Sequence, residues 1–160
     1  MSESIRRILF LCVSTVAFFQ TGAHCVQAFV HYPAWGSIGA DSFREYHRVM
    51  TPGALQFLLL PRIIEVSLAV LSLLFPPSGL KRRFLLVTFG LATVALLSTV
   101  LLQLPLQRQL GSIGNTPDIL AHLRTTDWIR QSAETIRAGL CFWMLWLLLR
   151  PSATVSSKVN

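Results

Sequence analysis

The sequence predicts an all-α membrane protein, in which four transmembrane helices form one bundle and short helical segments lie outside the membrane. Of its 160 residues, 52% are hydrophobic and only 13% are charged, whereas roughly a quarter of the residues of a soluble domain are charged. The apolar residues gather in four runs of about 20 residues or more, enough to cross ~30 Å of hydrocarbon. Most charged residues lie between these runs. We therefore expect a single polytopic membrane domain, residues 1–160, with the lipid bilayer as its first partner.

The predicted spans differ in how clearly the sequence marks them. Basic Arg6-Arg7 before an apolar stretch is also the pattern of a secretory signal, but no small-x-small cleavage site follows, so we expect a retained first span. The third span is the cleanest. The fourth ends in tryptophans and then Arg150-Pro151, where the aromatic and basic side chains suit the interface and proline stops the helix. The spans cover residues 8–30, 53–75, 84–106 and 128–149, and 151–160 are predicted to form a flexible tail.

The distribution of lysine and arginine predicts that both termini are cytoplasmic. Seven basic residues and a single acid, Glu3, lie on the side of the termini: Arg6, Arg7, Lys81, Arg82, Arg83, Arg150 and Lys158. The other side has five basic and four acidic residues: Arg44, Arg48, Arg108, Arg124, Arg130, Asp41, Glu45, Asp118 and Asp127. The short basic loop at 81–83 decides the orientation, because short loops dominate the positive-inside rule. We expect a multi-pass protein of the cell (inner) membrane.

The two segments that face outward in this orientation, 31–52 and 107–127, are predicted to contain short helices of their own. In the first, Asp41 or Ser42 would cap an amphipathic helix, which Pro52-Gly53 then interrupts or joins to the second span. In the second, Pro117-Asp118 would start a helix that leads toward the fourth span.

Composition also argues against several classes of function. The net charge of +7 does not indicate nucleic-acid binding, because the basic residues alternate with apolar runs, where they set topology and meet lipid head groups. The spacing of the three cysteines matches no metal-binding motif, so we interpret them as packing residues. A haem needs two histidines on facing spans, and only His24 lies inside one. A metal held by His31, His47 and a glutamate has no characteristic spacing. We predict no metal, and the cofactor stays open.

The most informative residues are polar side chains within the spans. Their spacing of three or four residues places them on one face of each helix. Four spans carry them at similar depth in the outer half of the membrane, whereas the inner half of the second span holds no charge. The set comprises Gln20, His24, Gln27 and His31 in the first span, Arg62 and Glu65 in the second, Gln103 in the third, and Arg130, Glu134 and Arg137 in the fourth.

Two interpretations of this set remain open. A charged side chain at the middle of a bilayer costs about 2.5–3.5 kcal/mol even on the lenient insertion scale, so the charged groups must face one another. Arg62 with Glu134 and Arg137 with Glu65 are the expected pairs, or Arg–Glu pairs within each helix. Such pairs can serve only to fix helix packing. Alternatively, they belong to a site, since intramembrane ionisable groups are functional candidates.

The functional interpretation assigns roles to these residues. Glu65 or Glu134 would act with His24 in acid–base chemistry, and Arg62 and Arg137 would stabilise a carboxylate, phenolate or enolate-like charge. An aromatic or quinone-like molecule would fit near Phe18, Phe19, Phe57 and Phe142. The residues predicted to bind the ligand are Gln20, Gln27, His31, His47, Gln103, Trp128 and Arg130. Trp35 and Trp128 also suit an interfacial aromatic belt. The pattern fits binding and catalysis equally.

The chain resembles the small four-span bacterial membrane proteins related to fungal anthrone oxygenase, most of which are uncharacterised. The resemblance covers roughly residues 10–145 and rests on His31-Tyr32-Pro33, Phe43-Arg44-Glu45-Tyr46-His47, Leu102-Gln103-Leu104-Pro105 and Trp128-Ile129-Arg130 with Arg137. It implies a site between the spans and, for the characterised members, cofactor-independent oxidation of aromatic polyketides. His47, Arg130 and Arg137 are the first residues to which a role would carry over.

A different class of function is an accessory subunit, whose polar faces pack against a larger membrane complex. Under that hypothesis the chain would be isolated with a membrane partner or as a homo-oligomer. Under the site hypothesis it would retain a small hydrophobic or aromatic ligand.

Overall fold

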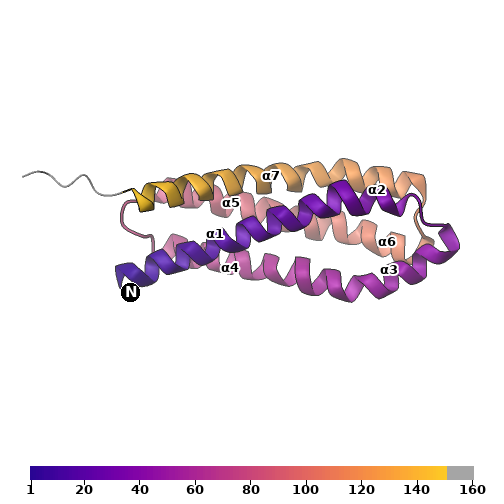
Figure 1. Ribbon diagram of the computed structural model, residues 1–160, viewed down its shortest axis with the longest axis horizontal. Coiled ribbons are helices and arrows are strands. Elements are labelled where there is room, and N and C mark those ends of the chain that lie inside the picture. Colours follow the sequence, from indigo (N-terminus) through magenta and orange to yellow (C-terminus); the bar gives the residue numbers. More distant parts are fainter. Residues whose placement is uncertain (151–160) are drawn as a thin grey trace, which may run out of the picture.

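Four long helices, running alternately up and down, form one elongated bundle (Figure 1). The computed structural model describes residues 1–150, so the prediction of a flexible tail at 151–160 lies outside the described residues. Each long helix has 32–35 residues, about 50 Å at 1.5 Å per residue. All four are apolar enough to cross a membrane, which confirms the predicted all-α fold. They are Glu3–Trp35, Ala40–Leu74, Arg82–Ile113 and Pro117–Leu149.

Three of the long helices consist of two α-helical parts joined by one π-helical turn. The first comprises α1 (Glu3–Val26), η1 (Gln27–His31) and α2 (Tyr32–Trp35), the second α3 (Ala40–Ala54), η2 (Leu55–Leu59) and α4 (Leu60–Leu74), and the third α5 (Arg82–Ser98), η3 (Thr99–Gln103) and α6 (Leu104–Ile113). The fourth is the uninterrupted α7 (Pro117–Leu149). Helix α1 packs against α4 and α7, and α5 packs against the same two helices.

The long helices extend beyond the predicted spans, because the expected outer helices continue directly into them. The second long helix begins at Ala40 after Gly39, and no side chain caps it, so the prediction of a cap at Asp41 or Ser42 is wrong. Pro52 lies inside α3 without ending it. The outer segments therefore lengthen the bundle instead of forming separate helices across its end.

Each π-helical turn precedes a proline by two residues. A proline has no backbone N–H and its ring clashes with the carbonyl four residues earlier, which is the central residue of the π-turn in all three cases. Widening the helix to a bond five residues back avoids that conflict. The bonds run from the N–H of Tyr32 to Gln27, of Leu60 to Leu55 and of Leu104 to Thr99, just before Pro33, Pro61 and Pro105.

A π-helical turn also changes which side chains face inward. The extra residue shifts the helical register by about 100° relative to an unbroken α-helix. In the first long helix the buried stripe passes from Gln27 to Tyr32, which is 2% exposed, instead of to His31, which is only half-buried. The predicted stripe of polar residues therefore ends at Gln27.

The two ends of the bundle have separate apolar cores. The core near the termini comprises Phe10, Leu80, Leu85 and Met144, and the core at the opposite, distal end comprises Tyr32, Trp35, Phe43, Leu106, Leu110, Leu120 and Leu123. Trp35 is fully buried, so it belongs to the distal core and not to the predicted interfacial belt. Between these cores, the buried small residues Ala69, Ala92 and Ala95 let neighbouring helices approach closely.

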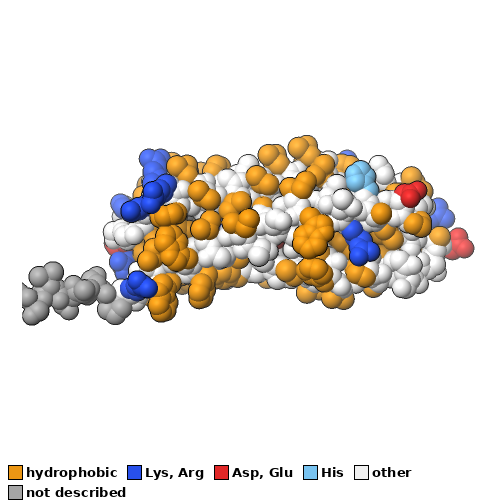
Figure 2. Space-filling view, turned by 90° about the horizontal axis from the view of Figure 1, so that it is seen from above, with side chains coloured by type: hydrophobic (Ala, Val, Ile, Leu, Met, Phe, Trp, Pro, Cys, Tyr) orange, Lys and Arg blue, Asp and Glu red, His pale blue; other side chains and the backbone are white. Residues whose placement is uncertain are grey.

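Hydrogen bonds close the bundle at both ends. At the distal end, Asn115 donates to the carbonyls of Trp35 and Ile38, each at 2.7 Å, and Gly114 adopts the positive φ of 102° that ends α6. Near the termini, the Glu3 carboxylate accepts from the backbone N–H of Ser78 at 2.9 Å. Figure 2 shows basic side chains gathered at the terminal end and hydrophobic side chains covering much of the length of the bundle.

Candidate functional site

Charged side chains from two helices meet in the centre of the bundle. Arg62 of α4 contacts the carboxylates of Glu65 and Glu134, and Arg137 of α7 contacts Glu65. His24 of α1 lies against the same group, and all five side chains are 2% exposed or less. We call His24, Arg62, Glu65, Glu134 and Arg137 the buried network. It brings together all five residues that the sequence predicted to be catalytic.

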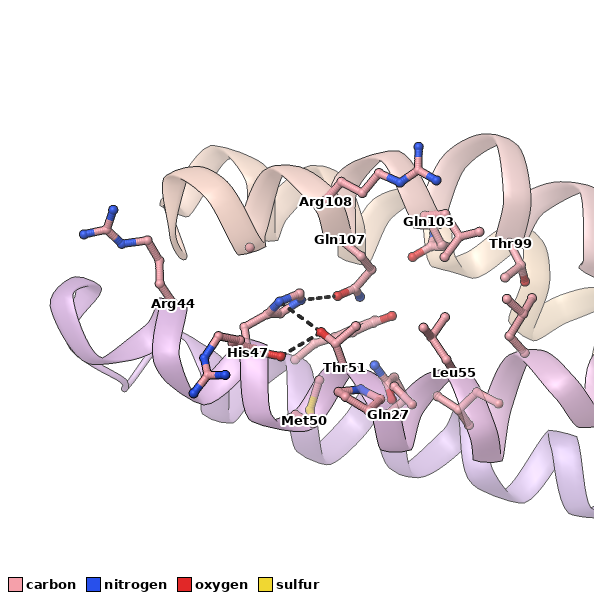
Figure 3. Close-up of a pocket in the computed structure, with 18 of the residues that line it drawn as sticks. Gln27, Arg44, His47, Met50, Thr51, Leu55, Thr99, Gln103, Gln107 and Arg108 are labelled. Carbon is pink, nitrogen blue, oxygen red and sulfur yellow. Dashed lines mark hydrogen bonds between the residues drawn. The ribbon is translucent and has the colours of Figure 1, made fainter.

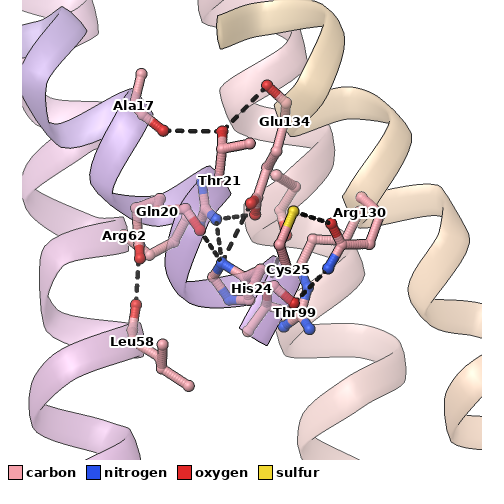
Figure 4. Close-up of polar contacts among 12 residues, drawn as sticks. Ala17, Gln20, Thr21, His24, Cys25, Leu58, Arg62, Thr99, Arg130 and Glu134 are labelled. Atoms are coloured by element: carbon pink, nitrogen blue, oxygen red, sulfur yellow. Dashed lines mark hydrogen bonds and ion pairs between the residues drawn. The ribbon is translucent and has the colours of Figure 1, made fainter. Parts of the chain in front are cut away.

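The histidine of the buried network ties α1 to its neighbours. Its Nδ1 lies 2.8 Å from the Gln20 carbonyl and 3.1 Å from Glu134 Oε2. Since a carbonyl can only accept, Nδ1 carries the proton and donates to the Gln20 oxygen, while the Glu134 carboxylate lies within ion-pair distance. In addition, Gln131 of α7 donates to the His24 carbonyl at 2.6 Å, and Gln20 donates to the Leu58 carbonyl at 3.0 Å. Figure 4 shows these contacts converging between the helices.

A cavity of about 600 Å³ lies beside this network, between the distal halves of the second and third long helices. Ligand pockets typically enclose about 300–1,000 Å³. None of the five residues of the buried network lines it. The lining residues come mainly from α3, η2, η3 and α6: Gln27, Tyr32, Arg44, His47, Arg48, Met50, Thr51, Pro52, Ala54, Leu55, Leu58, Leu59, Thr99, Gln103, Leu104, Gln107, Arg108, Gly111 and Arg130.

The cavity lies at the level of the three π-helical turns. The first residue of each turn lines it, namely Gln27, Leu55 and Thr99. Farther from the distal end, α4 and α5 pack directly against each other. The second and third long helices therefore pack closely along α4 and α5 and leave a hollow between their distal halves. Figure 3 shows this hollow.

Four polar residues form the wall of the cavity that faces the bundle centre: Gln27, Tyr32, Gln103 and Arg130. We call them the cavity wall. Arg130 contacts Asp127 and donates to the Tyr32 hydroxyl at 3.4 Å. Its Nε has no acceptor within residues 1–150.

Gln103 provides the cavity wall with a hydrogen-bond acceptor. Its amide nitrogen donates to the Thr126 hydroxyl at 3.1 Å. That hydroxyl is itself bound to the His122 carbonyl at 2.8 Å, so it can only accept from Gln103. The assignment leaves Gln103 Oε1 without a donor among the described residues, although the side chain is only 2% exposed. A buried acceptor of this kind is available to a ligand.

The distal end of the cavity is basic. His47 Nε2 lies 2.9 Å from Gln107 Oε1, and the Thr51 hydroxyl donates to the His47 carbonyl at 2.7 Å. Arg44 and Arg108 stand at the rim (Figure 3). No aspartate or glutamate is among the lining residues.

The residues predicted to bind a ligand separate into two groups. Gln27, His47, Gln103 and Arg130 line the cavity. The others do not: Gln20 joins the buried network, His31 is half-buried, and Trp128 is 61% exposed beside a smaller cavity of about 120 Å³. The phenylalanines expected to surround the site are 39–66% exposed and face away from it: Phe18, Phe19, Phe57 and Phe142.

Sequence reasoning missed Tyr32, Gln107 and Asp127 as site residues, the last because it was counted with an outer loop. It placed Thr99 among the polar residues of the third span without giving it a role. The prolines that follow the π-turns were the available signal for Tyr32. Within residues 1–150 no group of three histidine, cysteine or acidic side chains could hold a metal ion.

Fold and cavity together define a four-helix bundle of membrane-crossing length with a hollow between two of its helices. Comparisons of the chain with protein-family models, with curated proteins and with solved structures give no match.

Proposed function

We propose that this protein binds a small amphiphilic molecule, aromatic or lipid-like, in the cavity between its second and third long helices. The observation that carries the proposal is the cavity itself: about 600 Å³, with an unpartnered buried acceptor in its wall. Pockets of this size with a few convergent polar groups are the usual form of small-molecule sites.

The lining suits a mainly apolar ligand with a polar edge. Met50, Leu55, Leu58, Leu59 and Leu104 supply the apolar surface. A buried acceptor left without a donor costs about 1–3 kcal/mol, so a ligand hydroxyl or amide that reaches the Gln103 oxygen gains that stabilisation.

The buried network supports the site by holding the helices together. Its two arginines and two glutamates sum to zero charge, and they join α4 to α7. We therefore propose that these groups act as intramembrane ion pairs that set helix packing. Glu134 and Arg130 are four residues apart on α7, so the network and the cavity wall are adjacent turns of one helix.

We further propose that both termini are cytoplasmic, in the cell membrane, and that the cavity opens toward the outer leaflet. The support is the charge at the terminal end, where six basic residues of the described chain face a single acid: Arg6, Arg7, Lys81, Arg82, Arg83 and Arg150 against Glu3. This arrangement follows the positive-inside rule.

The resemblance to the anthrone oxygenase family supports an aromatic ligand. Of the three residues to which a role would carry over, His47 and Arg130 line the cavity, and Arg137 belongs to the buried network. If the resemblance holds, oxidation of the bound aromatic molecule is the activity to assay.

The proposal is tested by purifying the chain in mild detergent and identifying bound small molecules by native mass spectrometry. Leu58→Trp fills the cavity, and Leu60→Trp places the same side chain on the outside of the same helix, where Leu60 is 52% exposed. We expect a bound molecule in the wild type and in Leu60→Trp, and its loss in Leu58→Trp with unchanged thermal stability. An empty wild-type chain that always co-purifies with another membrane protein would instead establish the accessory-subunit hypothesis.

A further inference from the structure

The cavity changes in chemical character along its length. Arg44 and Leu59 both line it and lie fifteen residues apart on the second long helix, which corresponds to about 22 Å along the axis. The distal end carries Arg44, His47 and Arg108, whereas the deep end carries Leu58, Leu59 and Thr99. Figure 3 shows Arg44 and His47 toward one end of the hollow and Thr99 toward the other.

Two of the four arginines that line the cavity form no ion pair within residues 1–150. Arg48 contacts Glu45 at 2.6 Å, and Arg130 contacts Asp127. By contrast, neither Arg44 nor Arg108 contacts a carboxylate within residues 1–150. Two exposed cationic side chains therefore lie along the opening: Arg44 of α3 near its distal end, and Arg108 of α6, whose side chain extends toward Gln103 (Figure 3).

We infer that the ligand is an anionic amphiphile whose carboxylate or phosphate lies in the basic distal half of the cavity, which Arg44, His47 and Arg108 line, with its apolar body directed toward Leu58 and Thr99. This inference rests on the proposed function and adds the charge and the direction of the ligand. Charge-assisted hydrogen bonds from guanidinium groups are the strong way to hold such an anion.

A ligand bound in this way has the same orientation as a lipid of the outer leaflet. In the proposed orientation Arg108, just beyond the predicted end of the third span at residue 106, lies at the interface, Arg44 lies farther out, and Leu58 and Thr99 lie deeper in the membrane. A fatty acid or an aromatic acid in that leaflet already has its acidic group at the interface and its apolar part inward. It can therefore enter sideways between α3 and α6 without reversing, and without moving its charge through hydrocarbon, which is costly.

The experiment compares acids with their uncharged counterparts. The full-length chain in phosphatidylcholine nanodiscs is titrated with palmitate and with palmityl alcohol, and likewise with anthracene carboxylate and anthracene methanol. We expect both acids to bind about tenfold more tightly than their alcohols, and added salt to weaken only the acids. The acid of higher affinity distinguishes a lipid-like source from an aromatic one.

Variants locate the anion. In Arg44→Gln with Arg108→Gln, the affinity for the better acid should fall about tenfold while that for its alcohol stays within about twofold. Arg82→Gln with Arg83→Gln removes the same charge at the other end of the bundle and should change neither. Equal affinity for acid and alcohol, unaffected by the rim variant, would overturn this inference and leave the proposed function standing. Failure of all four compounds to bind, with an empty chain by mass spectrometry, would refute both.

Discussion

The buried network and the cavity wall are both polar, both buried and one helical turn apart on α7, yet only the wall borders open space. In the network, Arg62 contacts two carboxylates and Arg137 contacts one. Both regions leave polar atoms without partners among the described residues: Arg62 Nε, Glu134 Oε2, Arg137 Nε and Arg137 Nη2 in the network, and Gln103 Oε1 and Arg130 Nε in the wall. Only Gln103 and Arg130 line the cavity. The comparison teaches that a stripe of polar residues inside a membrane helix is not by itself a site. What marks the site is an unpaired polar group on a residue that also lines a cavity.

Helix geometry separates the two regions. The network lies where α4 and α7 are regular helices, so complementary side chains approach closely. The wall lies at the level of the π-helical turns, which change the direction of side chains and frequently occur at functional sites. The structure thus places rigid packing next to an open space.

The largest effect should follow from breaking the network. Glu65→Leu leaves Arg62 and Arg137 without their shared carboxylate, and breaking a buried pair typically costs about 3–5 kcal/mol. We expect a large fall in the free energy of unfolding, measured by denaturant titration in mixed micelles. Glu45→Leu, which removes the partner of exposed Arg48, should change it by less than about 0.5 kcal/mol. A Glu65→Leu protein that unfolds like the wild type but no longer binds ligand would show that the network is part of the ligand-binding site.

Changing the cavity wall should lower stability less than breaking the network does, and should weaken ligand binding more. Gln103→Leu removes the unpartnered acceptor together with one hydrogen bond to Thr126, so we expect the affinity for the ligand to fall about tenfold and stability by about 1 kcal/mol. Equilibrium binding in nanodiscs measures the first and denaturant titration the second. Gln56→Leu, at an exposed position of η2, is the matched control. Unchanged affinity in Gln103→Leu would show that the ligand does not use this oxygen.

The π-turns provide an intermediate test. Pro105→Ala restores a backbone N–H and removes the ring that favours the wide turn of η3. We expect this turn to tighten toward an α-helix and the affinity to fall about fivefold, with little change in stability. Pro117→Ala, at the start of α7 where no π-turn precedes the proline, should leave binding unchanged. Equal binding by both variants would mean that the cavity does not depend on the π-turn.

The smallest effect should come from Gly111→Ala at the distal end. A Cβ there would lie 3.3 Å from His47 Nδ1, so His47 must shift by a few tenths of an ångström. We expect about a twofold loss of affinity. Gly139→Ala, with nothing within 4 Å of its new Cβ, should bind normally and be up to about 1 kcal/mol more stable. Binding that is weakened equally in both variants would point to a general effect of the helices.

Much of the fold could be predicted because it depends on local properties of the chain. Runs of apolar residues determine which segments can lie in lipid, and helical spacing determined that His24, Glu65 and Glu134 would face inward at similar depth. Those predictions need no knowledge of neighbouring helices.

Only the tertiary structure determines which polar residues are packed inside the protein and which line a cavity. Arg130 and Arg137 share one face of α7 and have the same chemistry, yet only Arg130 borders open space. Likewise, Tyr32 replaced His31 on the inner face because a π-turn shifted the register. The physical reason is that a void and the pairing of charges depend on the positions of several helices at once, whereas hydropathy and periodicity describe one helix at a time.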